Sequence, residues 1–340
     1  MGARFLGRDE PGGLARLRVA AAWGHVQRVP AGTAVCGLGG GRSPLGEDDR
    51  RGVLGRFAPA RTVYPLPSDH PSLRGARQRA ARGLSGTSFD RAAEYYDRTR
   101  GLTPEGVARN TEIVAAELSG RGWVLEVGVG TGQVALPLHE TGIPVVGADI
   151  SSAMLSVLVS KAGGRAPFPI VLGDATILPF RDASVGGALF RWVLHLIPDW
   201  PIAVREVVRV SRRGGVVLVQ LGSYRGPRAE IQDRFAELTG VSHEPLGLGW
   251  NRYDLLDEEM RALGATPRGV PAFTENDNQS LDEFILGIED NLYSWTWRVP
   301  PGTLASVGTQ VRAWAEERWG SLEELRPESH EIAWRAYDLA

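Results

Sequence analysis

A glycine-rich loop follows a short apolar run near the middle of the chain and leads into a stretch typical of a helix. It reads Glu-Val-Gly-Val-Gly-Thr-Gly from Glu126 to Gly132. Glycines there let the backbone turn tightly and approach a ligand without a Cβ in the way. The helix that begins after Gly132 would offer free backbone N–H groups to a negatively charged group. The loop therefore predicts a cofactor site.

Two further acids stand where later apolar runs end. Asp149, in Val-Val-Gly-Ala-Asp, lies 23 residues after Glu126, where a ribose diol would present its hydroxyl groups in a doubly wound sheet. Asp174, in Leu-Gly-Asp-Ala, can accept a hydrogen bond from an exocyclic amine such as that of adenine. Three consecutive strands that each end in an acid, the first with a glycine loop, indicate a cofactor site. Caps and turns at the strand ends are the structural alternative.

The spacing within the loop separates two classes of cofactor. A dinucleotide-binding loop has glycine at relative positions 1, 3 and 6, and the sixth position counted from Gly128 is Gln133. A carboxylate at Glu126 would also repel a pyrophosphate, whereas it would attract the ammonium group of an amino-acid moiety. The loop therefore disfavours a nicotinamide dinucleotide.

Short apolar runs alternate with helical stretches around these residues. The predicted strands are 123–127, 144–149, 170–172, 188–192 and 216–221, with helices at 133–140, 152–161 and 203–209. Because the runs are continuously apolar, both faces of the sheet should be covered. Alternation of this kind predicts an α/β fold with a doubly wound, mostly parallel sheet.

Further elements are expected on both sides of this region. Ser88 can cap a helix over 89–96, and a second helix begins at Thr103-Pro104-Glu105, with a hydroxyl cap and a proline in the first turn. After residue 221 the pattern predicts helices at 230–238 and 254–263, a strand at 268–273, a helical, aromatic-rich insertion at 274–322 and a last strand at 330–339.

The first 86 residues differ in composition from the rest. They hold 14 Arg, no Lys and 6 acids, a net charge of +8, whereas the remaining residues carry 24 basic and 34 acidic residues, a net charge of −10. With 16 of the 43 glycines and no sustained period, 1–86 is expected to be a disordered tail or a misassigned start. The predicted catalytic domain is 87–340, with 87–222 as its cofactor-binding part and 223–340 as its C-terminal part.

Composition excludes several classes of function. The net charge of −10 outside the tail argues against nucleic acid as a partner, because phosphate contacts dominate such binding. No apolar run approaches the ~18 residues of a membrane span, so we expect no membrane partner and a cytoplasmic protein. Cys36 is the single cysteine, and the six histidines show no paired spacing, so no metal site is expected.

The run from Val124 to Leu221 resembles the class I S-adenosylmethionine-dependent methyltransferases, particularly the small-molecule branch that includes quinone-biosynthesis methyltransferases. The segments that carry the resemblance are LEVGVGTG, GADIS, GDATILPFRD, FRWVLHL and RVSRRGG, in family order. It implies a seven-stranded, Rossmann-like sheet with an antiparallel last strand, S-adenosyl-L-methionine as cofactor, and methyl transfer to a small molecule. Two segments depart from the family: Gly186-Gly187, where an acid is usual, and Arg212-Arg213, where Lys-Pro is usual.

The resemblance also assigns roles to residues. It implies that the three loop glycines wrap the amino-acid portion of the cofactor, that Asp149 binds the ribose and that Asp174 with Ala175 contacts the adenine. Tyr96, on the first helix, would close over the cofactor or pack against the protein. The complete predicted cofactor site consists of Glu126, Gly128, Gly130, Gly132, Asp149, Ile150, Asp174, Ala175, Arg191 and Tyr96.

His195 is the candidate general base. It follows the fourth predicted strand, whose end lies beside the methyl group in the family that the chain resembles. An imidazole near its ordinary pKa could take a proton from the acceptor around neutrality. Packing or hydrogen bonding at the strand end is the structural alternative for this residue.

Several acceptors are excluded by their chemistry. Methylation of cytosine C5 requires a cysteine nucleophile. In the family that the chain resembles, enzymes that methylate the amino groups of adenine or glutamine carry an Asn/Asp-Pro-Pro-aromatic motif after the fourth strand, where this chain has Phe190-Arg-Trp-Val-Leu194. A small molecule remains as the acceptor. The aromatic residues of the insertion, Tyr293, Trp295 and Trp297, would either line its binding site or pack the inserted helices onto the core. A nicotinamide-dependent oxidoreductase and a non-catalytic S-adenosylmethionine-binding protein are the alternative functions.

Overall fold

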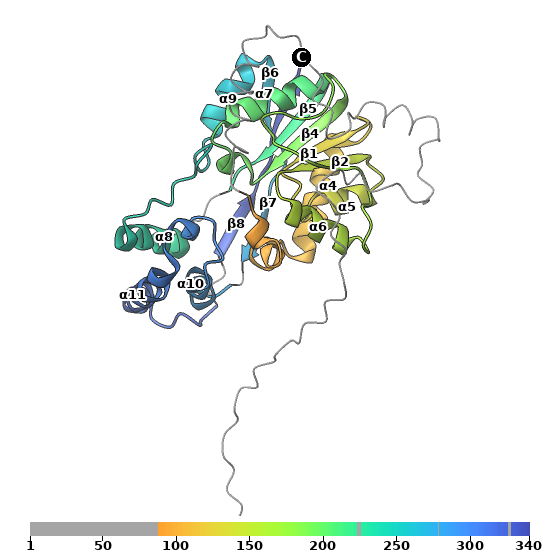
Figure 1. The fold of residues 1–340 in the computed structure, drawn as a ribbon. Helices are drawn as coiled ribbons and strands as arrows, with labels where there is room; N and C mark the ends of the chain where they lie inside the picture. Colours follow the sequence, from red (N-terminus) through yellow and green to blue (C-terminus); the bar gives the residue numbers. More distant parts are fainter. Residues whose placement is uncertain (1–87, 223–225, 278, 326–327) are drawn as a thin grey trace, which may run out of the picture. The chain divides into compact units, whose positions relative to one another are not determined.

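The structure is a computed structural model that describes residues 88–222, 226–277, 279–325 and 328–340. The predicted tail, 1–86, lies outside the described residues. The fold is mixed α/β and is built on a seven-stranded sheet, as Figure 1 shows.

The sheet has the strand order β3-β2-β1-β4-β5-β9-β6. Its strands are β3 (Ile170–Leu172), β2 (Val145–Asp149), β1 (Val124–Val127), β4 (Val185–Arg191), β5 (Ser211–Gln220), β9 (Arg335–Leu339) and β6 (Ala265–Gly269). The first five strands run parallel, whereas β9 is antiparallel to both β5 and β6. This confirms the predicted mostly parallel sheet with an antiparallel last strand. The strand order reverses between β1 and β4, which is the point where ligands bind in such sheets.

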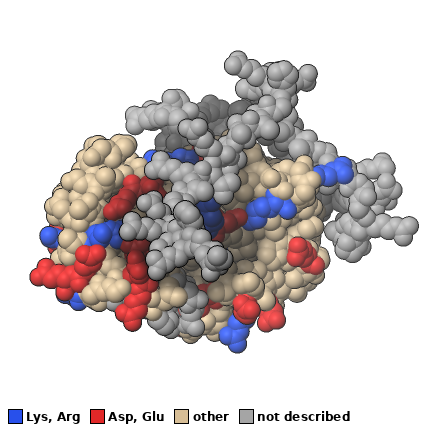
Figure 2. Space-filling view, turned by 90° about the horizontal axis from the view of Figure 1, so that it is seen from below, with Lys and Arg blue, Asp and Glu red and all other residues tan. Residues whose placement is uncertain are grey.

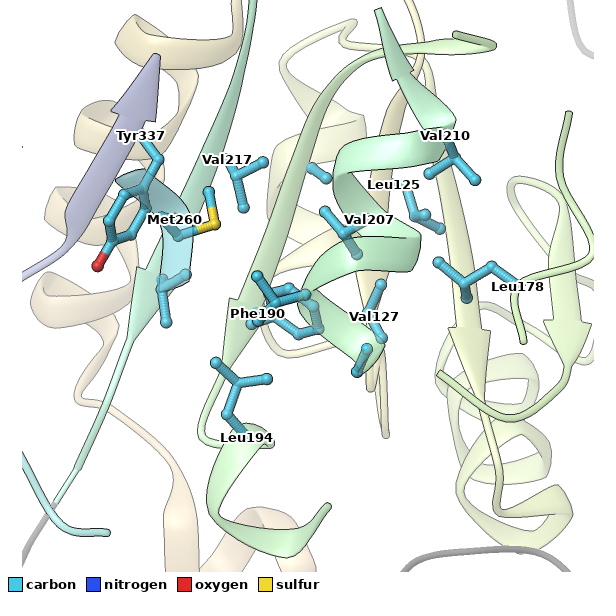
Figure 3. Packing of buried hydrophobic residues seen from close by; sticks show 14 of the residues in the cluster. Leu125, Val127, Leu178, Phe190, Leu194, Val207, Val210, Val217, Met260 and Tyr337 are labelled. Carbon is cyan, nitrogen blue, oxygen red and sulfur yellow. The ribbon is translucent and has the colours of Figure 1, made fainter. Parts of the chain in front are cut away.

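Helices cover both faces of the sheet because alternate residues of each strand point to opposite sides. Leu125 and Val127 pack in one apolar cluster with α7 (Trp200–Val210) and α9 (Tyr253–Ala262). Figure 3 shows this packing, with Val207 and Val210 of α7 lying against the strands. Val124 belongs to a second cluster with three other helices, α4 (Pro104–Leu118), α5 (Ala135–Glu140) and α6 (Ser152–Lys161). The two-sided burial explains the continuous apolar runs of the sequence.

A helical lobe forms a third apolar cluster from α8 (Gly226–Thr239), α10 (Leu281–Glu289) and α11 (Pro301–Trp319). The start of α10 is well defined, because Ser280 and Glu283 form a reciprocal capping box. The antiparallel strands β7 (Phe273–Asp277) and β8 (Glu328–Ile332) lead into and out of the part of this lobe that contains α10 and α11, whereas α8 comes earlier in the chain.

Both predicted strands of the C-terminal part are in fact divided. The strand expected at 268–273 is the end of β6 and the start of β7, and Pro271 between them cannot donate to a strand ladder. The strand expected at 330–339 is the end of β8 and all of β9. Between these two, Trp334 is buried and donates from Nε1 to Oδ1 of Asn110 on α4 at 2.8 Å. The predicted insertion, 274–322, therefore begins with most of β7 before it becomes helical.

The predicted first helix is also wrong in extent. Instead of one helix over 89–96, the chain forms a 3-10 turn, η1 (Asp90–Ala92), and a short helix, α3 (Tyr96–Arg100). Ser88 accepts a hydrogen bond from the Asp90 backbone N–H at 3.3 Å. The second predicted helix starts as expected, because the Thr103 side chain accepts from the Gly106 N–H at 3.0 Å with Pro104 in the first turn.

Candidate functional site

A cleft with about 730 Å³ of empty space, part of it open to solvent, lies at the carboxyl ends of the parallel strands. Eight of the ten predicted cofactor residues line it: Tyr96, Gly128, Gly130, Asp149, Ile150, Asp174, Ala175 and Arg191. Gly132 is not among the lining residues. Glu126 is not among them either, and it is buried within electrostatic reach of Arg191, which lines the cleft. Among the further lining residues, absent from the prediction, are Phe89, Met154, Trp192, Val193, Leu196 and Ile197.

The three loop glycines have different local reasons to be glycine. All three have positive φ, +74° at Gly128, +53° at Gly130 and +82° at Gly132. A Cβ at Gly128 would lie 2.6 Å from Val193 Cγ2, and one at Gly132 would lie 2.9 Å from Leu136 Cγ. At Gly130 the nearest atom would be 3.7 Å away. Gly128 and Gly132 thus permit close packing of the loop, whereas a Cβ at Gly130, which lines the cleft, would make only ordinary van der Waals contacts.

Asp149 holds the glycine loop in place. Its Oδ2 accepts from the Gly130 N–H at 2.7 Å, and its Oδ1 accepts from the Ser151 N–H at 2.8 Å. Burial raises the pKa of this carboxyl above its ordinary value, although the backbone donors oppose that shift. The Ile150 N–H is a third backbone donor to this carboxylate. Because a carboxylate has about four acceptor sites, capacity remains for a hydroxyl donor from the cleft.

Asp174 is shaped by a local turn after β3. Its Oδ1 accepts from both the backbone N–H and the hydroxyl of Thr176, each at 2.8 Å. This turn places Asp174 and Ala175 at the end of the cleft next to β3, beyond Asp149 on β2.

Glu126 and Arg191 form a buried polar pair on the neighbouring strands β1 and β4. Arg191 donates from Nη1 to the Gln133 side-chain oxygen at 2.6 Å and from Nε to that of Gln220 at 3.1 Å. Within the described part of the chain, however, Arg191 Nη2 and Glu126 Oε2 are both buried with no hydrogen-bond partner. Burial raises the pKa of Glu126 to about 8, despite the opposing charge of Arg191. Unsatisfied buried polar atoms are rare, and they call for an explanation such as a ligand.

Two acids anchor the N-terminal segment, η1 and α3, over the cleft. Asp90 accepts from the Ser151 hydroxyl at 2.6 Å and from the Ala153 N–H at the start of α6. Asp97 accepts from Thr131, Gln133 and Lys161 at 2.5, 2.9 and 2.7 Å, and these hydrogen bonds lower its pKa. The two anchors hold Phe89 and Tyr96 against the cleft, with ring centroids 5.9 Å apart.

The structure places His195 differently from the prediction. Its ring packs 4.8 Å from that of Trp250, and its neighbours Leu196 and Val193 line the cleft while it does not. Its backbone carbonyl accepts from Gly247 at 2.9 Å. Burial, with the nearby charge of Arg100, lowers the pKa of His195 to about 3, so the expected ordinary pKa is wrong. The imidazole is neutral at pH 7 and is a weak base.

The aromatic residues of the insertion have two different surroundings. Tyr293 and Trp295 are buried in the helical lobe, where their rings stack 5.6 Å apart and Trp295 meets Phe235 edge-on. Trp297 instead lies 5.0 Å from Phe89, which itself lines the cleft. Tyr293 and Trp295 therefore pack the lobe, as the structural alternative for the insertion supposed.

The surface shows no strong separation of charge where it is visible. On the face in Figure 2, acidic and basic side chains lie in small groups among uncharged ones. Among the described residues, no cluster of three or more His, Cys, Asp or Glu could hold a metal ion. No helix in the described ranges is long and apolar enough to cross a membrane.

Comparisons with known proteins agree on one kind of enzyme. Residues 125–219 match the family described as a methyltransferase domain. The chain is similar to a demethylmenaquinone methyltransferase of Mycolicibacterium vanbaalenii, at 34% identity over 237 residues, which cover 69% of this chain and 87% of that protein. It is also similar to a phosphatidylethanolamine N-methyltransferase of Cereibacter sphaeroides, at 32% identity over 179 residues, 51% of this chain and 81% of that protein.

Among solved structures, the chain is similar to the YcgJ protein of Bacillus subtilis. The sequence identity is 21% and the TM-score is 0.46, over 68% of this chain and 97% of that one.

Proposed function

Because the chain belongs to the class I S-adenosylmethionine-dependent methyltransferases, we propose that its cleft binds S-adenosyl-L-methionine and that it methylates a small-molecule acceptor. The observation that carries this proposal is the pair of unpartnered buried atoms, Glu126 Oε2 and Arg191 Nη2, beside the glycine loop. One is an acceptor and the other a cationic donor. An α-amino acid presents the complementary groups, an ammonium and a carboxylate.

The amino-acid portion of the cofactor would be held by these two side chains. Glu126, once ionised, would accept from the ammonium, and Arg191 would donate to the carboxylate in a charge-assisted hydrogen bond. Since the pKa of Glu126 is about 8 in the protein alone, binding of the ammonium at neutral pH would release a proton from Glu126. Cofactor binding is therefore expected to depend on pH.

The remaining contacts follow the strand ends. Asp149 would accept from a ribose hydroxyl with the capacity that its backbone donors leave. Asp174 and Ala175 would border the adenine, and Ile150, Leu196 and Ile197 are apolar residues of the same lining. Gly130, a lining residue without a side chain, would let the ligand approach the backbone of the loop.

The chemistry requires mainly alignment from the protein. When bound, the sulfonium cofactor supplies an already activated methyl group. Orientation of two reactants can contribute about 7–11 kcal/mol to lowering a barrier. The N-terminal segment, anchored by Asp90 and Asp97, would help to exclude water by holding Phe89 and Tyr96 over the cleft. A neutral His195 outside the cleft supports packing rather than proton transfer as its role.

Gln133 also bears on the nicotinamide alternative. Its side chain accepts from Arg191 and donates to Asp97, so the position where a dinucleotide loop has its third glycine is occupied by a bridging amide. This arrangement supports the methyl donor as the cofactor.

The proposal is tested by binding and by turnover. Calorimetry should show micromolar binding of S-adenosyl-L-methionine and much weaker binding of NAD. A metabolite extract incubated with the protein and methyl-labelled cofactor should then yield a labelled small molecule in mass spectrometry. Preferential binding of NAD would contradict the cofactor assignment, and cofactor binding without any labelled product would favour a non-catalytic binding protein.

A further inference from the structure

Arg191 is held by two amide side chains that leave one of its nitrogens unbonded. Its Nη1 donates to the Gln133 side-chain oxygen at 2.6 Å, and its Nε donates to that of Gln220 at 3.1 Å. Arg191 is 7% exposed, and its Nη2 has no hydrogen-bond partner among the described residues. Because a guanidinium is planar and its donors lie in a fixed fork, two bonds fix the direction of the third nitrogen. Gln133 and Gln220 therefore decide where Arg191 meets a ligand.

The amide of Gln133 has only one favourable orientation between its two neighbours. Its nitrogen donates to Asp97 Oδ1 at 2.9 Å, and its oxygen accepts from Arg191. Arg191 can only donate, and an ionised Asp97 can only accept. Burial alone would raise the pKa of Asp97, but its hydrogen bonds hold that pKa below the ordinary value. An inverted amide would place donor against donor and acceptor against acceptor. Asp97 thus directs the Gln133 oxygen toward Arg191.

Asp97 is itself fixed by partners from two other elements. Its Oδ1 also accepts from the Thr131 hydroxyl of the glycine loop at 2.5 Å, and its Oδ2 accepts from Lys161, the last residue of α6, at 2.7 Å. Asp97 belongs to α3 in the N-terminal segment, and it is not among the residues that line the cleft. Hydrogen bonds nevertheless connect it through Gln133 to Arg191, which does line the cleft.

We propose that Asp97 and Gln133 are positioning residues that keep Arg191 Nη2 available for the cofactor carboxylate, so that the N-terminal segment helps to recognise a group that it does not touch. The inference rests on the proposed function and extends it to residues outside the cleft lining. An amide suits this role because it orients Arg191 without competing, as a carboxylate would, for the guanidinium charge. The negative charges of Glu126 and Asp97 also act on Arg191. Removal of the Asp97 charge therefore has two consequences for a bound carboxylate, a loss of positioning and a loss of repulsion.

Two adenosine thioethers measure the contribution of the carboxylate alone. 5′-(3-Carboxypropylthio)-5′-deoxyadenosine carries the carboxylate of S-adenosylhomocysteine without its ammonium, and 5′-methylthioadenosine carries neither group. Calorimetry with the full-length protein gives the ratio of the two affinities. A change in folding, or in the aromatic cover over the cleft, would alter both affinities alike, so the ratio reports on Arg191. We expect Gln133→Leu to lower this ratio about threefold to tenfold, the factor that corresponds to one ordinary hydrogen bond.

Asp97→Asn separates positioning from charge. Asparagine has a single side-chain oxygen, so it cannot accept from both Lys161 and Gln133, and the Gln133 amide is no longer directed. Loss of the negative charge should by itself favour a carboxylate at Arg191, and it should do so whether or not Gln133 is present. Loss of positioning should lower the ratio only where Gln133 is present. We therefore expect the factor by which Asp97→Asn changes the ratio to be about threefold smaller in the wild type than in Gln133→Leu, a non-additive pair.

Gln232→Leu is the matched control, because it replaces a buried glutamine of the helical lobe and should leave the ratio unchanged. An unchanged ratio in Gln133→Leu would overturn the inference, and so would an equal effect of Asp97→Asn in both backgrounds. Equal affinity of the wild type for the two thioethers, in a protein that binds S-adenosylhomocysteine, would also overturn it. Failure of the wild type to bind S-adenosylhomocysteine would instead overturn the proposed function, and this inference with it.

Discussion

The cleft region and the helical lobe bury polar and aromatic groups in different ways. At the cleft, Glu126 and Arg191 each keep a buried polar atom without a partner among the described residues, and the glycine loop has three residues with positive φ. In the lobe, the aromatic rings of Phe235, Tyr293 and Trp295 pack against one another. The lobe also holds buried polar atoms without a partner among the described residues, Gln232 Nε2 and Trp295 Nε1, but both belong to uncharged groups, whereas those at the cleft belong to an acid and a cation. Binding and stability should therefore respond to changes in different regions.

The largest effect is expected from Gly130→Val. A side chain there would project at the lining of the cleft and would force a β-branched residue to φ +53°, so calorimetry should detect no S-adenosyl-L-methionine binding. Gly142→Val is the matched control, because Gly142 has φ +88° and a Cβ at that position would have no neighbour within 4 Å beyond the adjoining residues. It should cause comparable backbone strain and leave cofactor affinity intact. Equal loss of binding in both variants would show that strain alone is responsible.

Phe284→Ala should lower stability and leave cofactor binding unchanged. Phe284 is 1% exposed and lies 5.0 Å from Tyr293, so its truncation should lower the free energy of unfolding by about 3–5 kcal/mol. Denaturant unfolding measures this loss. Cofactor affinity, measured well below the melting temperature, should stay within experimental error. A large loss of affinity would mean that the lobe and the cleft are coupled.

Glu126→Gln should separate affinity from stability within one residue. Loss of the ionic partner of the cofactor ammonium should weaken binding by about 1.5–3 kcal/mol, the range for a hydrogen bond to a charged group. At high pH, by contrast, the Glu126→Gln substitution should raise the free energy of unfolding. Because the folded pKa of Glu126 is raised to about 8 from 4.5, the wild-type protein loses stability as pH rises from about 5 to 8.

The glutamine variant has no proton to lose at this position. Its melting temperature should therefore fall less than that of the wild type over the same pH interval, and it should be the more stable protein above pH 8. Identical pH profiles of the two proteins would show that burial does not hold the proton on Glu126.

The smallest effect on chemistry is expected from His195→Ala. Because the ring packs on Trp250 and its pKa is about 3, its loss should lower the melting temperature by a few degrees. With any acceptor that gives turnover, the maximal rate should fall less than the factor of about 10²–10⁴ that a general base contributes, and the pH–rate profile should keep its shape. A larger loss of rate, with the disappearance of an inflection, would restore His195 as a base.

The cofactor side of the site was the more predictable part, for a physical reason. Ligand contacts in a parallel sheet fall at the strand ends, so Gly130 and Asp149 stand next to apolar runs that the sequence displays. Trp192 and Gly222 also follow strands, but a Cβ at Gly222 after β5 would lie 2.9 Å from Trp192 Nε1 after β4, and no short motif reports such a close approach. A large aromatic residue directly after one buried strand, with a glycine after the neighbouring strand, is the sequence pattern that could have indicated this contact.

The C-terminal part was harder to predict because its elements depend on distant partners. β7 pairs with β8 across the whole lobe, and the break before β9 depends on the bond from Trp334 to Asn110, far away in the sequence. The start of α10 was the exception, since Ser280 and Glu283 have the spacing of a capping box. The pKa of His195 depends on burial and on the charge of Arg100, a distant residue that sequence spacing could not associate with it.

The central claim is that Glu126 and Arg191 recognise the amino-acid portion of the cofactor, and proton release on binding tests it most directly. S-adenosyl-L-methionine is titrated into the protein at pH 7 in buffers that differ in ionisation enthalpy, and the number of protons released is obtained from the slope. Since Glu126 has a pKa of about 8 before binding, the account predicts release of close to one proton in the wild type and almost none in Glu126→Gln. Tight binding of the cofactor with no proton release, and with equal affinity in the variant, would contradict it.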